Sequence, residues 1–516
     1  MVALVVVVVA QVVQVVLNKL LTKKGLHRPF FIFYNIIFFI DMQRFLFIYF
    51  CIILFWAPIP LGSHRIWSAA LLELLIGLLF IFWLLTLKQN TLPKALINNK
   101  KLIALFAAIP LWSALQLIPL PPEIITLISP HHQNYIAANQ WQPLSLDPGA
   151  TLYKLQKSIA YCLFFILCLA LINTPSRLNT TAQVIVITGV LQAVYGVLVV
   201  LGGPVFDVFG IAAAADRDRI TSASGTFVNR NNFAGYLEMC IALGIGLLVN
   251  QILINKDKFA GVRAAIRNFL ITMLSGKARL RVFLALMVVA LVLSHSRGGN
   301  SAFYASLGVC AVLGLWLYRK HHKSKSLALL FGSLIAIDVL ILSSWFGLDT
   351  LAKRLDSTNI AYEERSFVFE NTLLAVKDFW LTGSGVGGFY SIFPSYRDNR
   401  SQSFYDFAHN DYLQLWIEYG LIGLSLFGLI VILSFIKALK AQQHRHTAIL
   451  KGMGFAAMMA IISLMIHATT EFNFHIPANA LLFTLICAIA CIAADMEYQE
   501  HEPKKRRKHS MPSTKA

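Results

Sequence analysis

The sequence has few charged residues for its length, and few of those are acidic. Only 13% of its 516 residues are charged, whereas soluble globular proteins carry roughly 25%. The short alternating segments of a membrane β-barrel are missing too. Instead, apolar runs of about 20 residues, long enough for a membrane-spanning helix, recur along most of the chain, and the mean hydropathy is +0.66. The sequence therefore predicts a polytopic α-helical membrane protein rather than a soluble domain.

The cysteines do not show the spacing of a metal site or of a disulfide framework. All seven lie inside apolar runs and none lies in a loop. We interpret them as small buried side chains.

The first 41 residues contain no clear cleavage site for a signal peptide. The stretch from Val2 to Val16 is nearly all valine, and no small-residue site follows it. We interpret residues 1–41 as an N-terminal extension and Met42 as the true start. N-terminal sequencing of the natural protein would test this interpretation.

The apolar runs predict an all-α fold with about twelve transmembrane helices. We divide the rest of the chain into transmembrane helices in 42–347, a large periplasmic loop over 348–410, further transmembrane helices in 411–495 and a basic cytoplasmic tail over 496–516. The expected spans are 44–61, 67–87, 101–119, 153–172, 181–202, 233–254, 282–296, 300–318, 327–347, 411–436, 448–468 and 479–495.

Lysines and arginines cluster in short segments between the apolar runs, as in the cytoplasmic loops of inner-membrane proteins. Such segments are 256–281, Arg319–Lys323 and Lys504–Lys508. The opposite, periplasmic face then carries the loop over 119–150, which has no Lys or Arg, and the long loop over 347–409. The net charge of +19 thus indicates topology and membrane lipid rather than nucleic acid.

Three polar segments interrupt this pattern, and the topology places all of them at the periplasmic face. The first is 224–232, which ends in Asn229-Arg230-Asn231-Asn232. Asn231 or Asn232 can cap a helix beginning at Phe233. Capping does not require Arg230, whose guanidinium suits phosphate oxygens. The alternative for Arg230 is an arginine that snorkels to the interface.

The second segment is Ser294–Gly299, between two closely spaced spans. A tight hairpin needs Gly298 and Gly299, because glycine allows a sharp turn or close approach to a ligand. It does not need Arg297, which we interpret as a second outer-face cation that binds an anion.

The third segment begins at Ala408, where the long loop re-enters the membrane. Asn410 or Asp411 can cap the helix that continues to Ile436. His409 then precedes the cap, where the positive end of the helix dipole disfavours the protonated imidazole. We therefore interpret His409 as a candidate general base.

Weaker candidates surround these segments. The glycine-rich stretch 383–389 is expected to form a flexible turn, and Arg397 to reach an anionic head group. A helix is expected from Glu364 to Trp380 within the long loop. Two histidines and a carboxylate in one external turn, His467, Glu471 and His475, have the ligand types of a zinc site, although a polar helix end is the commoner interpretation.

In this order the segments resemble the O-antigen ligase and polymerase superfamily. The similar stretches are SGTFVNRNNFAGYLEM at 224–239, LSHSRGG at 293–299, GSGVGGF at 383–389 and AHNDYLQLWIEYGLIGL at 408–424. The stretch EFNFHIPANALLF at 471–483 resembles one bacterial subgroup. The resemblance extends over roughly Met42 to Asp495.

The resemblance implies a GT-C-like helical bundle, a metal-independent glycosyltransferase without cofactors, and a glycan donor linked to undecaprenyl diphosphate. It implies that Arg230 and Arg297 hold the diphosphate and that His409 is the catalytic histidine. The expected substrate-binding residues are Asn229, Asn410, Asp411, Arg397 and Tyr396.

The acceptor stays open at this point. It is a hydroxyl of lipid A core in a ligase, of a growing glycan in a polymerase, or of a protein in an O-oligosaccharyltransferase. A lipid-linked glycan transporter is the alternative from another class. Transporters usually place ionisable residues deep in the membrane, whereas here the charges gather at one interface.

Overall fold

The computed structural model describes residues 28–87, 92–135, 140–208, 221–254, 276–319, 324, 327–333, 336, 359–398 and 405–497. Within these ranges the regular structure is helical, apart from one isolated β-bridge between Leu120 and Gln142.

Eight helices in the described residues are long and apolar enough to cross a membrane. This confirms a polytopic α-helical membrane protein, although a count of about twelve spans is not confirmed. The helices are α3 (Ile66–Leu85), α7 (Pro148–Leu171), α8 (Pro175–Gly202), α10 (Arg230–Ile254), α13 (Arg297–Tyr318), α18 (Asp411–His444), α19 (Ala448–His467) and α20 (Pro477–Asp495).

Further helices coincide with predicted spans but are shorter or more charged. They are α2 (Arg28–Trp56), whose apolar part is Met42–Trp56, α5 (Lys100–Leu115) and α12 (Gly276–Leu293). The helix α2 continues through Met42 without a break. The predicted span 327–347 lies mostly outside the described residues, as does nearly all of the basic tail.

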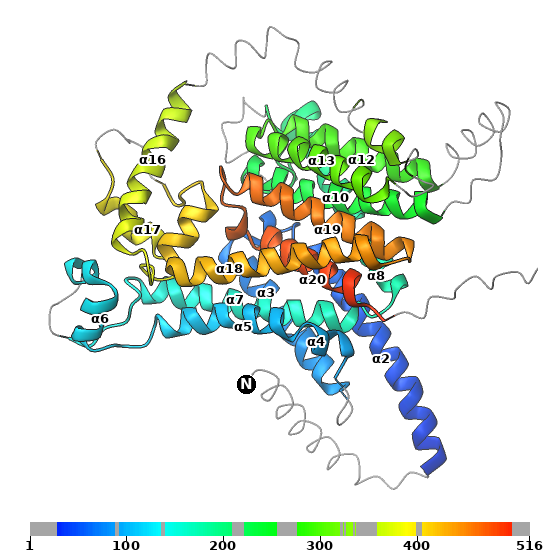
Figure 1. Ribbon diagram of the computed structural model, residues 1–516, viewed down its shortest axis with the longest axis horizontal. Helices are drawn as coiled ribbons and strands as arrows, with labels where there is room; N and C mark the ends of the chain where they lie inside the picture. The colour runs from blue at the N-terminus through cyan, green and yellow to red at the C-terminus, as the bar shows by residue number, and fades with distance from the viewer. Residues whose placement is uncertain are drawn as a thin grey trace, which may run out of the picture.

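The bundle is built around α10, α19 and α20 (Figure 1). The helix α19 packs against α10, α13, α18 and α20. Small residues allow α10 and α19 to approach closely: a Cβ atom added to Gly246 would lie 2.5 Å from the carbonyl oxygen of Gly452. Within the membrane-length window, 94% of α20 is buried but only 28% of α18. The helix α18 therefore lies at the outside of the bundle.

Helices that are not among the eight candidate spans gather at one end of the bundle, on the left in Figure 1. They are α6 (Pro122–Ile128), α16 (Asn359–Asp378) and α17 (Phe389–Ile392), the last followed by the 3-10 turn η4 (Phe393–Ser395). The helix α16 confirms the helix predicted for the long loop. Its buried Val368 and Val376 form a small core with Phe389, Phe393 and, on α18, Ile417. The described part of the loop is thus folded onto the bundle.

The glycine-rich stretch 383–389 is packed tightly, which corrects the prediction of a flexible turn. Gly383, Gly385 and Gly387 all have positive φ, a conformation that glycine adopts at no steric cost. A Cβ atom on Gly383 would lie 2.4 Å from the carbonyl oxygen of Glu418. The stretch fits against a break in α18 at Gly420, where φ is 67° and a Cβ atom would lie 2.2 Å from the carbonyl oxygen of Leu381. Glycine is needed at these positions because the two backbone segments lie too close together for a side chain.

Candidate active site

The three polar segments meet at the turn between α19 and α20, residues 468–476, which we call the α19–α20 turn. The amide of Asp411 donates to the carbonyl oxygens of Ala468 and Glu471 at 2.9 and 3.1 Å. Nδ2 of Asn231 donates to a carboxylate oxygen of Glu471. A Cβ atom on Gly298 would lie 2.4 Å from Oγ1 of Thr470. One short turn therefore contacts the start of α10, of α13 and of α18.

His409 is held in an unusual backbone conformation at this junction. Its φ is +49°, which is uncommon for a residue other than glycine. Such strain persists where the surrounding structure enforces it, often at functional sites. The rings of Tyr405 and Phe472 form T-shaped pairs with the imidazole, with ring centroids 6.2 and 5.0 Å away.

Nδ1 of His409 lies 3.3 Å from Oε2 of Glu471, whose side chain is only 2% exposed. A carboxylate has no proton to donate, so Nδ1 is the donor. The other ring nitrogen, Nε2, then keeps its lone pair and is able to accept a proton. A carboxylate that orients a histidine in this way is part of the Ser-His-Asp arrangement of hydrolases.

The imidazole lines a cavity of about 340 Å³, which we call the histidine cavity. Asn229 and Asn232 line it from the start of α10. It is bounded by Leu61, His64, Phe227, Val228, Asn229, Asn232, Tyr405, Asp406, Phe407, His409, Phe472 and Ile476. The histidine is 21% exposed. The cavity thus combines a partly accessible base with amide groups that can hydrogen-bond a polar substrate.

The first segment begins its helix earlier than predicted. The helix α10 starts at Arg230 and not at Phe233. Oδ1 of Asn229 accepts from the amide of Asn231 at 2.8 Å, so Asn229 is the capping residue. This frees the side chain of Asn231 for Glu471 and that of Asn232 for Asn473.

The second segment also differs from the prediction. The turn between α12 and α13 contains His295 at φ +54°, and Ser296 caps α13 by accepting from the amide of Gly299 at 3.2 Å. Gly298 and Gly299 lie inside α13 rather than in the hairpin. A Cβ atom on Gly299 would lie 2.7 Å from Cβ of Ala234. These glycines allow α13 to approach α10 and α19.

The third segment confirms the capping prediction. Oδ1 of Asn410 accepts from the amides of Tyr412 and Leu413 at 3.0 and 3.1 Å, and its Nδ2 donates to the carbonyl oxygen of Thr469 at 3.0 Å. Asp411 is buried and accepts from the amide of Phe474 at 3.2 Å. Both residues therefore hold the start of α18 against the α19–α20 turn, and their binding of substrate stays a prediction.

The two predicted anion-binding arginines are the first residues of their helices. Arg230 begins α10 and Arg297 begins α13, and both are exposed. The unpaired amides at a helix start carry partial positive charge, so each guanidinium adds to a site that already favours an anion. Asn231, next to Arg230, and Gly298, next to Arg297, both contact the α19–α20 turn.

Tyr396 and Arg397 follow η4 in the long loop. Arg397 is exposed. The hydroxyl of Tyr396 donates to Oδ2 of Asp378 at 2.6 Å. Burial, together with the hydrogen bonds to Asp378 and Tyr135, raises the pKa of Tyr396. Tyr396 thus helps to fold the loop, and a role in substrate binding stays a prediction for both residues.

The three residues considered for zinc have separate partners. Nδ1 of His467 lies 2.8 Å from Oε1 of Glu238 on α10, with both side chains fully buried. Glu471 contacts His409 and Asn231. Nδ1 of His475 accepts from Nζ of Lys154 at 3.2 Å. The structure therefore divides this group into separate polar contacts.

Glu471 is the site residue that sequence analysis did not assign to the base. The sequence singled it out only as a possible zinc ligand beside His467 and His475, since its contacts with His409 and Asn231 join segments far apart in the chain. His64 also lines the histidine cavity. Burial, followed by the charges of Lys157, Lys154 and Arg65, lowers the pKa of His64 to about 4. Its imidazole is therefore neutral at ordinary pH.

The fold and the site define a polytopic helical membrane protein with a histidine–carboxylate pair at the end of the bundle. Residues 282–428 match the family model described as O-Antigen ligase. This match covers less than a third of the chain and supports the resemblance to an O-antigen ligase-type family. The matched segment contains Arg297 and His409, whereas Arg230 and Glu471 lie outside it.

The chain is also similar to a protein of Haemophilus influenzae strain Rd described as uncharacterized. The two are 26% identical over 228 residues, which is 40% of this chain and 55% of the relative. The alignment thus covers about half the length of that relative.

Proposed function

We propose that the protein transfers a glycan from undecaprenyl diphosphate to an acceptor hydroxyl at the periplasmic face of the inner membrane. The hydrogen-bonding distance between His409 and Glu471 at the edge of the histidine cavity carries this proposal. It is supported by the two exposed arginines at helix starts and by the O-antigen ligase match over residues 282–428.

In the proposed reaction, Nε2 of His409 takes the proton of the acceptor hydroxyl. The acceptor oxygen forms a bond to the anomeric carbon of the donor sugar, and the bond from that carbon to the diphosphate oxygen breaks. The electron pair leaves with undecaprenyl diphosphate. Arg230 and Arg297 stabilise the charge that develops on this leaving group. Glu471 keeps the imidazole oriented and stabilises the imidazolium that forms.

The reaction needs no nucleotide sugar and, in this proposal, no metal ion. A lipid diphosphate is already a good leaving group, so the site needs cationic charge more than a general acid. General-base catalysis by a placed histidine contributes typically 10²–10⁴-fold.

The test is transfer by purified protein from an undecaprenyl-diphosphate glycan in the presence of EDTA. Wild type is compared with His409→Ala and with His444→Ala, a matched variant at the exposed far end of α18. We expect transfer by wild type and His444→Ala, and its collapse in His409→Ala. Full activity of His409→Ala would overturn the site assignment.

We favour a lipid A core acceptor, as in a ligase. A deletion strain tests this choice through its surface glycans. Loss of all long chains from the core indicates a ligase, and a single repeat unit on the core indicates a polymerase. Unchanged glycolipid with a lighter glycoprotein indicates transfer to protein.

A further inference from the structure

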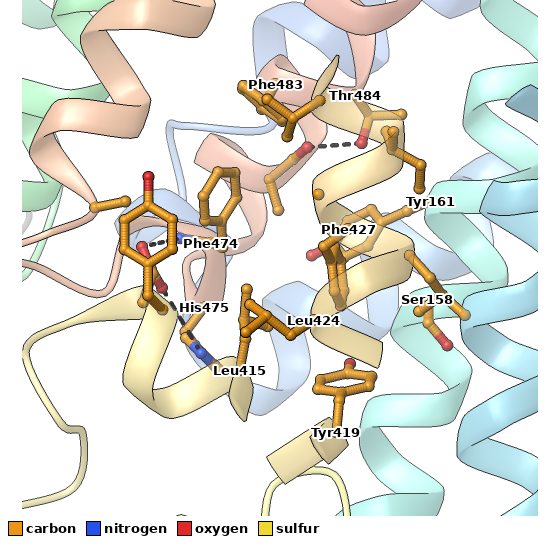
Figure 2. A pocket seen from close by; sticks show the side chains of 18 of the residues that line it. Ser158, Tyr161, Leu415, Tyr419, Leu424, Phe427, Phe474, His475, Phe483 and Thr484 are labelled. Carbon is orange, nitrogen blue, oxygen red and sulfur yellow. Dashed lines mark hydrogen bonds and ion pairs between the residues drawn. The ribbon is translucent and has the colours of Figure 1, made fainter. Parts of the chain in front are cut away.

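A second cavity lies behind the start of α18, between α5, α7, α18, α19 and α20. Its volume is about 530 Å³, within the usual range of small-molecule sites. Figure 2 shows Leu415, Leu424 and Phe427 of α18 around it, with Phe474 and Phe483 opposite. We call it the apolar cavity, because most of its lining side chains are apolar.

The polarity of the apolar cavity changes along its length. Its acidic and basic lining residues belong to the first three turns of α7 and α18 and to the α19–α20 turn: Lys154, Lys157, Asp411, Glu418 and His475. Beyond the break at Gly420, the residues of α18 that line it are uncharged, including Leu424, Phe427 and Val431. This gradient fits a lipid, with a polar head at the bundle end and a chain in the membrane-spanning part.

The polar end holds buried atoms that lack hydrogen-bond partners among the described residues. They are Oδ1 of Asp411, Oε2 of Glu418 and Nε2 of His475. Asp411 and Glu418 are each 1% exposed. Nδ1 of His475 accepts from Lys154, so Nε2 carries the proton, and it lies 3.8 Å from Asp411, too far for a hydrogen bond. Buried polar groups are almost always hydrogen-bonded, so these atoms point to a polar ligand.

The apolar cavity also adjoins the histidine cavity. His475 lines the first, and its ring lies 5.5 Å from the ring of Phe407, which lines the second. Asp411 follows His409 by two positions. At the outside, Tyr412 and Ile432 line the apolar cavity and are 38% and 56% exposed on α18. A lipid that enters from the bilayer at this face would therefore have its polar end next to the histidine cavity.

We propose that the apolar cavity binds the polyprenyl chain of the lipid-linked donor, with Lys154 facing the phosphate nearest the chain. Cations and carboxylates both line the polar end, which matches a head group that carries phosphate oxygens and sugar hydroxyls. This subsite rests on the proposed function, because it assigns a place to the donor of that reaction.

The test introduces a large side chain on α18 that fills part of the apolar cavity. A Cβ atom on Gly428 meets no atom within 4 Å, so a larger side chain can extend into the cavity. Leu429, its neighbour, is 45% exposed on the outer face and gives the matched control. Binding of undecaprenyl phosphate and of phosphatidylglycerol to purified wild type, Gly428→Phe and Leu429→Phe is measured by native mass spectrometry. If Gly428→Phe does not fold, Gly428→Leu takes its place.

We expect Gly428→Phe to bind undecaprenyl phosphate roughly tenfold more weakly, a factor that corresponds to about 1.4 kcal/mol. Leu429→Phe should stay within about twofold of wild type. Equal binding by both variants, or wild-type binding of phosphatidylglycerol as tight as that of undecaprenyl phosphate, would overturn the proposal. The binding assay does not depend on transfer. If the variants bind as expected but the purified protein transfers no glycan, the proposed function is contradicted and the lipid-binding site is not.

Discussion

Nδ1 of His409 and Oε2 of Glu471 lie 3.3 Å apart, although the residues are 62 positions apart in the sequence. His409 precedes α18, and Glu471 belongs to the α19–α20 turn. The pair forms because the amide of Asp411 is bonded to the carbonyl oxygens of that turn. The proposed base is thus positioned by tertiary packing and not by its own motif.

The first prediction concerns Glu471→Gln. The amide keeps the size of the side chain and an acceptor oxygen but cannot stabilise an imidazolium by charge. We expect kcat to fall about 10²-fold, within the usual range for general-base catalysis, with KM for the donor within about twofold. A purely structural role would instead lower the melting temperature. Glu497→Gln is the control, because Glu497 pairs with Lys94 at the exposed surface; an equal loss there would contradict the assignment.

The second prediction concerns Arg297→Lys. The substitution keeps the charge at the start of α13 but removes the planar fork that matches phosphate oxygens. We expect kcat/KM for a lipid-diphosphate donor to fall about 10²-fold. Arg319→Lys is the matched control, since Arg319 follows the last residue of the same helix and is exposed. Initial rates over a range of donor concentrations give both constants, and unchanged constants in Arg297→Lys would refute its contact with the diphosphate.

Composition was sufficient to predict the fold class, because a membrane-spanning helix must satisfy its own backbone and therefore needs a long apolar run. The sequence also narrowed the cap of α18 to Asn410 or Asp411, and the structure shows that Asn410 is the cap. The start of α10 could not be predicted in the same way. Several asparagines in a row can cap a helix, and the choice of Asn229 depends on Asn231 reaching Glu471 far along the chain.

The structural roles of the glycines could not be predicted from the sequence either. Gly298 and Gly299 were expected to shape a hairpin, and Gly383 to give flexibility. Each is instead required by a neighbour that comes from another segment, such as Thr470 for Gly298 and Glu418 for Gly383. A single sequence does not reveal such neighbours, so it shows that glycine is present but not which contact requires it.

The third prediction follows from this packing. In Gly298→Ala the new methyl group would lie 2.4 Å from Oγ1 of Thr470 and 3.0 Å from the ring of His467. We expect a loss of stability of about 1–3 kcal/mol, as for other overpacked sites. Gly308→Ala on the same helix meets no atom within 4 Å and should be neutral or stabilising by up to about 1 kcal/mol. Thermal unfolding in detergent measures both, and equal melting temperatures would count against the packing.

The last prediction concerns His64 and acid. Burial and nearby cations, Lys157 first among them, lower the pKa of His64 to about 4, whereas an unfolded histidine titrates near 6.5. Above about pH 6.5 His64 is neutral in both states and adds no pH dependence. Between about pH 6.5 and 4 the unfolded chain binds a proton that the folded chain does not. The free energy of unfolding therefore decreases as the pH is lowered through this range, by up to about 1.4 kcal/mol per pH unit. Unfolding measured from about pH 7.5 to 5 should show a smaller loss in His64→Gln than in wild type or in His444→Gln. Equal losses in all of them would show that His64 is protonated in the folded protein.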